Sequence, residues 1–224
     1  MATFLLLETS SEICSVALSR DGDIVQEKSI TQPNAHSSHL ASFVQEILEA
    51  EDIHPHHLDA VVLSSGPGSY TGLRIGCSLA KGICFGTDIP LIAVSTLRAM
   101  AYAAREEIVN AETYIALVDA RRMDAYMGIY DASLKTIEPE TFITINDTLD
   151  VPYENAVVVG SGATKFLREL GLESQYSQVS SGLYAKYLLD EAMQKWKVGA
   201  YVDLVSFEPN YIKSVYTTKP KSKF

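Results

Sequence analysis

The chain has 224 residues, of which 47% are hydrophobic, and its formal net charge at pH 7 is -10. This length and hydrophobic content allow a full core to be buried, which excludes wholesale disorder. The negative charge repels phosphate and so disfavours nucleic-acid binding by the surface as a whole.

The cysteines and the N-terminus indicate the compartment. Three cysteines are present, Cys14, Cys77 and Cys84, and none belongs to a CxxC pair. Such a set is typical of reduced thiols buried as small apolar groups. The first apolar run ends at Glu8, too soon for a signal peptide, and no segment reaches the ~18 apolar residues of a membrane span. We therefore expect a cytoplasmic protein that does not contact a membrane.

The first half of the chain predicts three strands followed by alternating helices and strands. Apolar runs at 3–7, 13–19 and 23–30, with Asp-Gly at 21–22, indicate an antiparallel meander. Apolar residues at helical spacing predict helices over 37–51 and 71–85, and Ser95 is a suitable N-cap for a third helix that ends near residue 107. Runs at 60–63 and 90–94 are typical of buried strands. This order predicts a mixed sheet covered by helices.

The second half repeats features of the first half in the same order. The apolar run 114–118 ends in Asp119, as the run 4–7 ends in Glu8, and the strand-turn segments 59–66 and 155–162 also correspond. These matches predict an internal duplication. We expect a first unit over 1–108, a degenerate second unit over 109–200 that includes a helix at about 181–197, and a C-terminal segment over 201–224 that ends in a mobile basic tail.

Two tandem copies of this unit, each with an acidic residue that ends its first strand, resemble the actin-like α/β fold, with two subdomains that each hold a mixed five-stranded sheet flanked by helices. In that fold the two acidic residues face each other across a cleft and hold a metal-nucleotide. The expected remnant of this cleft comprises Glu8, Thr9, Ser10, Gly66, Gly68, Asp119, Gly160 and Gly162.

The stretch SSGPGSYTGLRIG at 64–76 looks like a phosphate-binding loop but fits neither standard motif. Five residues rather than four separate Gly66 from Gly72, and Leu73 stands where the Walker A motif has lysine. The glycine spacing is also one residue too long for the Rossmann fingerprint, and Pro67 removes one backbone donor. These departures favour a tight structural turn over a phosphate cradle.

Small residues recur along the next helix at Gly72, Gly76 and Ala80. Glycine inside a helix costs ~1 kcal/mol relative to alanine, so a close approach by another backbone should offset it. Two alternatives stay open, namely packing against the chain's own sheet or 40–48 helix, and packing against a helix of another subunit.

Five segments carry a resemblance to a known family. They are LLLETSSEICSVAL at 5–18, HSSHLASFVQEIL at 36–48, LSSGPGSYTGLRIG at 63–76, GTDIPLIAVSTLRAMA at 86–101 and ALVDARRMDAYMGIY at 116–130. In order and spacing they resemble the TsaB (YeaZ-like) family, the accessory proteins of tRNA threonylcarbamoyladenosine (t6A) biosynthesis, also labelled glycoprotease-like. The likeness covers about residues 1–130, and beyond it EPNYI at 208–212 also matches.

The resemblance implies a non-catalytic subunit with an actin-like fold. TsaB looks like a degenerate paralogue of TsaD, which transfers a threonylcarbamoyl group to N6 of adenosine 37 in tRNAs that read codons starting with A. TsaD uses a metal held by an HxxxH pair, whereas the matching stretch here, 95–100, has no histidine. The resemblance therefore implies no catalytic residue, no metal and no cofactor of the chain's own, because ATP and metal act on partner subunits.

The resemblance also implies the partners. TsaB pairs with TsaD through the helices of its first unit, the ATPase TsaE joins the pair, and tRNA is reached only through the complex. Alone, the same helices are expected to form a homodimer. The residues expected at this interface are Leu40, Phe43, Val44, Ile47, Gly72, Leu73, Gly76 and Ala80.

Two other functions stay open on the residues alone. Glu8, Asp119 and the Ser-Gly turns would suit an ATP-dependent enzyme of the actin-like kinase class, and the glycoprotease label suggests a metallopeptidase. The peptidase is the less favoured, because the histidines at 36 and 39 are only three residues apart and the other three lie in a Pro-broken loop without cysteine or carboxylate partners.

Overall fold

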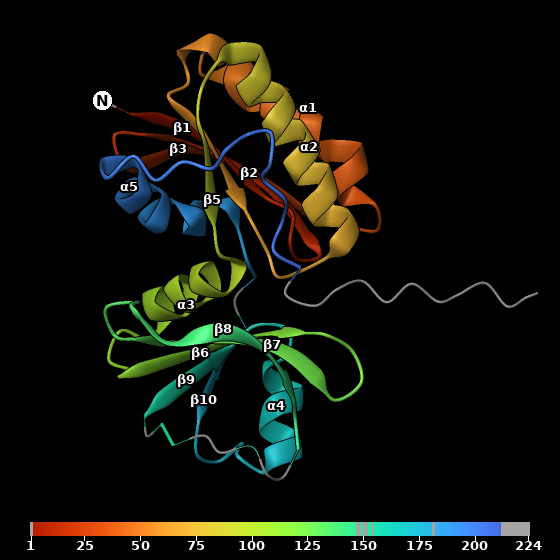
Figure 1. Cartoon of the computed structure of the whole chain (residues 1–224), viewed down its shortest axis with the longest axis vertical. Helices are drawn as coiled ribbons and strands as arrows, with labels where there is room; N and C mark the ends of the chain where they lie inside the picture. The colour runs from red at the N-terminus through yellow and green to blue at the C-terminus, as the bar shows by residue number, and fades with distance from the viewer. Residues whose placement is uncertain (1, 147–148, 150–151, 154, 181, 212–224) are drawn as a thin grey trace, which may run out of the picture.

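The computed structural model describes residues 2–146, 149, 152–153, 155–180 and 182–211. The basic tail and the last residue of the EPNYI match lie outside these described residues. The chain forms two α/β units that lie one above the other, each built on its own five-stranded sheet (Figure 1).

The first sheet contains the predicted antiparallel meander and two parallel strands, in the order β3-β2-β1-β4-β5. Asp21 and Gly22 both have positive φ, 56° and 94°, as a two-residue hairpin turn between twisted strands requires. Its strands are β1 (Thr3–Glu8), β2 (Ile13–Arg20), β3 (Asp23–Thr31), β4 (Ala60–Ser64) and β5 (Leu91–Val94).

Both faces of this sheet are covered, which explains why β1 is apolar throughout. Leu5 and Leu7 point to the face covered by helices α1 (Ala35–Ala50) and α2 (Tyr70–Thr87), whereas Phe4 and Leu6 point to the opposite face. A short 3-10 turn, η1 (Pro55–His57), precedes β4. The predicted helices of this unit are confirmed, including α3 (Thr96–Glu107) with Ser95 as its N-cap.

The second sheet has the order β10-β9-β6-β7-β8, which is the order of the first sheet when the strands are numbered within each unit. The predicted duplication and the actin-like α/β fold class are therefore confirmed. β8 and β10 were not predicted. The elements are β6 (Thr113–Asp119), β7 (Asp124–Asp131), β8 (Thr136–Thr144), β9 (Ala156–Val159), β10 (Ser177–Val179) and, on the outer face, α4 (Ala163–Leu170).

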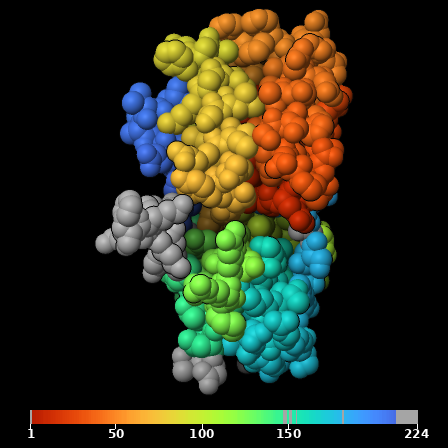
Figure 2. All heavy atoms as spheres, turned by 90° about the vertical axis from the view of Figure 1, so that its right-hand side faces the viewer, coloured from red at the N-terminus to blue at the C-terminus, as the bar shows by residue number. Residues whose placement is uncertain are grey.

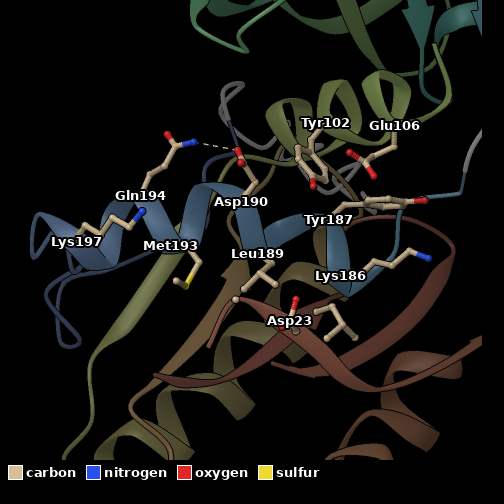
Figure 3. Close-up of a pocket in the computed structure, with 12 residues that line it drawn as sticks. Asp23, Tyr102, Glu106, Lys186, Tyr187, Leu189, Asp190, Met193, Gln194 and Lys197 are labelled. Carbon is tan, nitrogen blue, oxygen red and sulfur yellow. Dashed lines mark hydrogen bonds between the residues drawn. The ribbon is translucent and has the colours of Figure 1, made fainter. Parts of the chain in front are cut away.

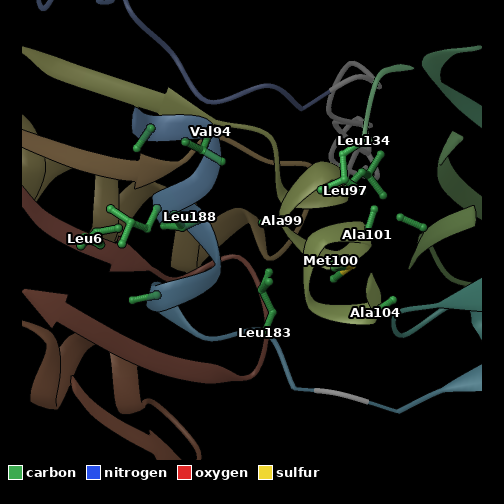
Figure 4. Close-up of a cluster of buried hydrophobic side chains, with 14 of the residues drawn as sticks. Leu6, Val94, Leu97, Ala99, Met100, Ala101, Ala104, Leu134, Leu183 and Leu188 are labelled. Atoms are coloured by element: carbon green, nitrogen blue, oxygen red, sulfur yellow. The ribbon is translucent and has the colours of Figure 1, made fainter. Parts of the chain in front are cut away.

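Helix α3 lies between the two units and joins their cores (Figure 4). Its side chains Leu97, Met100 and Ala104 belong to one buried cluster that also contains Leu6 of the first sheet and Tyr114 of the second. Several alanines of α3 are buried in the same cluster, and their small size permits close packing on both sides. The relative position of the two units is thus set by a continuous apolar core.

The last helical segment crosses back to the first unit. We predicted one helix over 181–197, but the chain forms a 3-10 turn, η2 (Ala185–Leu188), followed by α5 (Leu189–Lys197). The rings of Phe4 and Trp196 lie 5.3 Å apart, so α5 packs on the first sheet although the sequence pattern grouped it with the second unit. The three cysteines are buried and unbridged, as predicted. Within the described part of the chain, no helix is both long and apolar enough to cross a membrane.

Candidate functional site

A cleft of about 1190 Å³ opens between the two units. Ser10 and Ser69 of the first unit and Ser161 and Thr164 of the second unit are among the residues that line it. Figure 2 faces the side on which the red turn after β1, the gold start of α2 and the bright green β6–β7 turn come together.

The structure brings only half of the predicted cleft residues to the cleft surface. Ser10, Gly68, Asp119 and Gly160 line it. The other four residues are buried and do not line it, namely Glu8, Thr9, Gly66 and Gly162.

Glu8 is enclosed by its own turn and does not face the cleft. Its Oε1 accepts hydrogen bonds from the backbone N of Ser10 at 2.6 Å and from the Ser10 hydroxyl at 2.5 Å, and its Oε2 is buried without a partner among the described residues. Burial raises the pKa of Glu8 to about 7, although the bonds from Ser10 act in the opposite direction. The expectation that Glu8 faces Asp119 across the cleft is therefore wrong.

Asp119 reaches the cleft but is paired within the chain. The ammonium of Lys165 contacts its Oδ1 and also donates to the carbonyl oxygens of Arg122, at 3.0 Å, and Asp124, at 2.7 Å. Asp119 Oδ1 also accepts from the backbone N of Arg121 at 3.0 Å. We did not single out Lys165, although the duplication offered a signal: it lies in the first turn of the helix after β9, which corresponds to the start of α2 after β4.

The GPGSYTG segment forms a tight turn against the chain's own Thr9–Ser10 turn. The backbone N of Ser69 donates to the carbonyl of Ser10 at 2.7 Å, and the Ser69 hydroxyl caps α2 by accepting from the N of Gly72 at 3.2 Å. A Cβ added to Gly68 would lie 2.3 Å from the Ser10 carbonyl oxygen, and one added to Gly72 would lie 2.1 Å from that of Thr9. These glycines therefore let two turns of the same chain touch.

The small-residue stripe of α2 is likewise internal. A Cβ at Gly76 would lie 2.3 Å from the Thr9 hydroxyl, and Gly72, Gly76 and Ala80 are all buried. The sequence left open whether this stripe packs within the chain or against another subunit. In the structure it packs within the chain, against the first sheet and the turn that follows β1.

The residues predicted at the partner interface require a correction. Seven of the eight are buried in their own chain, and only the eighth, Phe43, is partly exposed; the seven are Leu40, Val44, Ile47, Gly72, Leu73, Gly76 and Ala80. The physical reason is that apolar periodicity identifies the face a helix turns towards its own core. These seven residues are therefore not available for contact with a partner.

Metal ligands do not gather in the described residues, where no group of three His, Cys, Asp or Glu side chains is close enough to share an ion. His36 lines the cleft, and burial lowers its pKa. His54, the N-cap of η1, stacks on His56 within it, with ring centroids 5.2 Å apart.

The comparisons with known proteins identify the family. The family model described as "TsaD: tRNA N6-adenosine threonylcarbamoyltransferase" matches residues 23–213. The Haemophilus influenzae "tRNA threonylcarbamoyladenosine biosynthesis protein TsaB" is 30% identical over 232 residues, which cover 97% of this chain and 96% of that protein. The chain belongs to the TsaB family. The Bacillus subtilis protein of the same name is 32% identical over 154 residues, 66% of this chain and 65% of that protein.

The solved structures agree with membership of the TsaB family. The structure titled "YeaZ from Pseudomonas aeruginosa" superposes with a TM-score of 0.82 at 27% identity and covers 97% of this chain and 100% of that chain. Catalytic relatives match a smaller part: the Wolbachia pipientis tRNA N6-adenosine threonylcarbamoyltransferase is 32% identical over 120 residues, 47% of this chain and 36% of that protein.

A second hollow, of about 620 Å³, lies between the β2–β3 turn, α3 and α5 of this TsaB-family chain (Figure 3). Tyr102 and Tyr187 form one side of it, with ring centroids 6.2 Å apart. Asp190 at its rim accepts from Arg98 and from Gln194, both at 3.0 Å. This carboxylate is thus already paired within the chain.

Proposed function

We propose that this chain is an accessory subunit of a tRNA threonylcarbamoyltransferase complex, without catalytic activity or a cofactor of its own. The names of its relatives place them in t6A biosynthesis. The observation that carries the proposal is the state of the two carboxylates expected in a nucleotide cleft. Glu8 is buried in its own turn, and Asp119 is paired with Lys165, so neither is available to a metal-bound nucleotide.

The proposed partner is TsaD, and the proposed contact is the outward face of α1 and α2. These helices lie side by side on the outer face of the first sheet (Figure 1). The C-terminal segment packs against α2, where the Val205 carbonyl accepts from Lys81 at 3.4 Å and the rings of Tyr70 and Tyr211 lie 5.0 Å apart. Phe85 of α2 is 86% exposed, and a Cβ at Gly82 or Gly86 would meet no atom within 4 Å. A protruding aromatic ring beside two bare backbone positions suits close docking of another helix.

The same face would account for the other proposed assemblies. Without TsaD, two copies of the chain would pair through it as a homodimer, since an isologous contact uses the same patch twice. TsaE would join the TsaD pair, and tRNA would be bound by the complex rather than by this acidic chain alone.

The test is co-elution of this chain with TsaD after a substitution at the exposed ring. Phe85→Asp should abolish co-elution and lower threonylcarbamoyl transfer by TsaD by about 30-fold or more, the effect of losing a central interface residue. The matched control is Val109→Asp, because Val109 is 72% exposed but lies outside both helices. Co-elution of Phe85→Asp at the wild-type level would reject this interface, and wild-type chain that does not co-elute with TsaD would reject the proposed function.

An ATP-dependent activity of the actin-like kinase class is the second candidate. It draws on the volume of the cleft and on the serine and threonine residues that line it. It predicts heat on titration of the chain with ATP and magnesium, together with loss of that heat in Asp119→Asn. The accessory role predicts no heat in either protein.

A further inference from the structure

The β6–β7 turn at the cleft has a strained backbone. Arg121 and Arg122 are consecutive residues with left-handed φ values of 68° and 50°. This conformation costs an L-residue other than glycine roughly 1–2 kcal/mol, and arginine has no short polar group to offset the cost. Strain of this kind persists where the surroundings hold it, and it concentrates at functional sites.

The turn is held by its backbone and by Lys165, not by the arginine side chains. The N of Ala120 donates to the carbonyl of Asp124 at 3.1 Å, and the N of Asp124 donates to the carbonyl of Arg121 at 3.0 Å. Lys165 binds the carbonyls of Arg122 and Asp124 from α4. Among the described residues, the two guanidinium groups are therefore not needed to hold the turn.

Arg121 and Arg122 differ from the other arginines of the chain in their side-chain contacts. All seven lie in the described part, and Arg121 and Arg122 are exposed with no side-chain contact there. The other five contact a carboxylate or a tyrosine of the chain: Arg20, Arg74, Arg98, Arg105 and Arg168. In a chain with 28 acidic residues, two adjacent guanidinium groups without a partner in the described part form a local basic patch against the overall charge.

The surroundings of the patch supply further donors. Arg121 lines the same cleft as Ser161, Thr164 and Tyr70. Tyr70 is held by Arg74, whose guanidinium donates to the Tyr70 hydroxyl at 2.7 Å and lies 5.1 Å from the centre of its ring. Arg74 does not itself line the cleft, but it is bonded to Tyr70, which does.

We propose that Arg121 and Arg122 bind the phosphate backbone of RNA at the mouth of the cleft when the chain sits in its complex. This inference rests on the proposed function and adds an RNA contact to it. Guanidinium groups pair with phosphate in a bidentate way, and the neighbouring hydroxyls can donate to further phosphate oxygens. The net charge of -10 opposes RNA binding by the isolated chain, so the contact acts together with a partner that also binds the RNA.

The experiment measures tRNA affinity of the assembled complex of this chain with TsaD and TsaE over a range of salt concentrations. The probe is an unmodified tRNA transcript that reads codons starting with A. We compare the wild type with the double variant Arg121→Ala/Arg122→Ala. The matched control, Arg20→Ala/Arg168→Ala, removes two arginines that are paired with carboxylates on the chain. Co-elution of every variant with TsaD is measured in parallel.

The double variant should bind tRNA about tenfold more weakly at moderate salt, with a salt slope smaller by about 1–2, because each lost phosphate contact removes about 0.7–0.9 from that slope. The control should match the wild type. Arg121→Lys/Arg122→Lys should keep the salt slope but recover only part of the affinity, since lysine keeps the charge without the bidentate fork.

Two outcomes would overturn the proposal. One is unchanged affinity and slope in a complex that assembles normally. The other is loss of co-elution with TsaD, which would assign the arginine pair to an acidic protein surface instead. If the wild-type chain does not assemble with TsaD, the proposed function fails and this inference fails with it, whereas unchanged tRNA binding by the double variant in an assembled complex overturns the RNA contact alone.

Discussion

Helix α2 carries glycines in two opposite environments, which gives a matched test of how the GPGSYTG turn is packed. A Cβ at Gly72 would lie 2.1 Å from the backbone carbonyl oxygen of Thr9, far inside van der Waals contact. A Cβ at Gly82, in the same helix, would meet no atom within 4 Å. The same substitution, glycine to alanine, should therefore have opposite effects on stability at the two positions.

The magnitudes follow from two terms. Alanine in place of glycine favours a helix interior by about 1 kcal/mol, which is the whole effect expected for Gly82→Ala. At Gly72 the clash adds an overpacking cost of about 1–3 kcal/mol, at the upper end because a main-chain oxygen has to move. We therefore expect Gly72→Ala to lose about 2 kcal/mol net. For a chain of 224 residues, each kcal/mol moves the unfolding midpoint by about 2–4 °C.

Thermal unfolding followed by circular dichroism tests this difference. Gly82→Ala should unfold about 2–4 °C above the wild type, and Gly72→Ala about 4–8 °C below it. All proteins are compared at one concentration, because self-association would shift the midpoints. A midpoint for Gly72→Ala at or above that of the wild type would refute the account of the stripe as internal packing.

Two further predictions concern the carboxylates of the cleft. Burial raises the pKa of Glu8 to about 7 from 4.5, so the folded chain holds this proton where the unfolded chain has lost it. The contribution of Glu8 to stability is then greatest below about pH 4.5 and falls until about pH 7, by up to about 3 kcal/mol. Glu8→Gln should remove this fall in urea titrations between pH 5 and pH 8, whereas parallel wild-type and variant curves would contradict it. Lys165→Met should destabilise the chain by about 1–2 kcal/mol, since two carbonyls and Asp119 lose a donor. Hydrogen exchange should then accelerate over 119–124 and stay unchanged in the first unit, and uniform exchange over both units would show that Lys165 does not hold this turn.

The sequence predicted those elements whose signals are local. The meander of β1 to β3 follows from two-sided burial and the Asp-Gly turn at 21–22, which need no information from elsewhere in the chain. β8 contains Pro139 and mostly exposed or half-exposed side chains, because it is an edge strand that pairs only with β7. Neither its composition nor the three-residue length of β10 gives a periodic signal. The helical spacing near 189–197 was read correctly, but the sheet on which α5 packs depends on long-range contacts.

For the site as well, the sequence predicted where residues lie along the chain but not what surrounds them in the fold. The sequence placed Glu8 and Asp119 correctly at the ends of corresponding strands. It did not predict that one is buried or that the other binds Lys165, which lies 46 residues further along the chain. Seven of the eight residues expected at the interface are buried for a related reason. Apolar spacing in α1 and α2 marks the inward face, whereas the exposed Phe85 lies off that pattern.

The carboxyl groups of Glu8 and Asp119, which end corresponding strands, have their negative charges reduced in different ways. Glu8 keeps its proton until near neutral pH because it is buried, and Asp119 is compensated by the ammonium of Lys165. A divalent cation would have to displace a proton at one and a lysine at the other, which disfavours a metal-nucleotide. The same neutralisation removes much of the repulsion that an approaching polyanion would meet. The guanidinium groups of Arg121 and Arg122, which have no partner among the described residues, would then contribute more strongly to the potential there, as the proposed RNA contact requires.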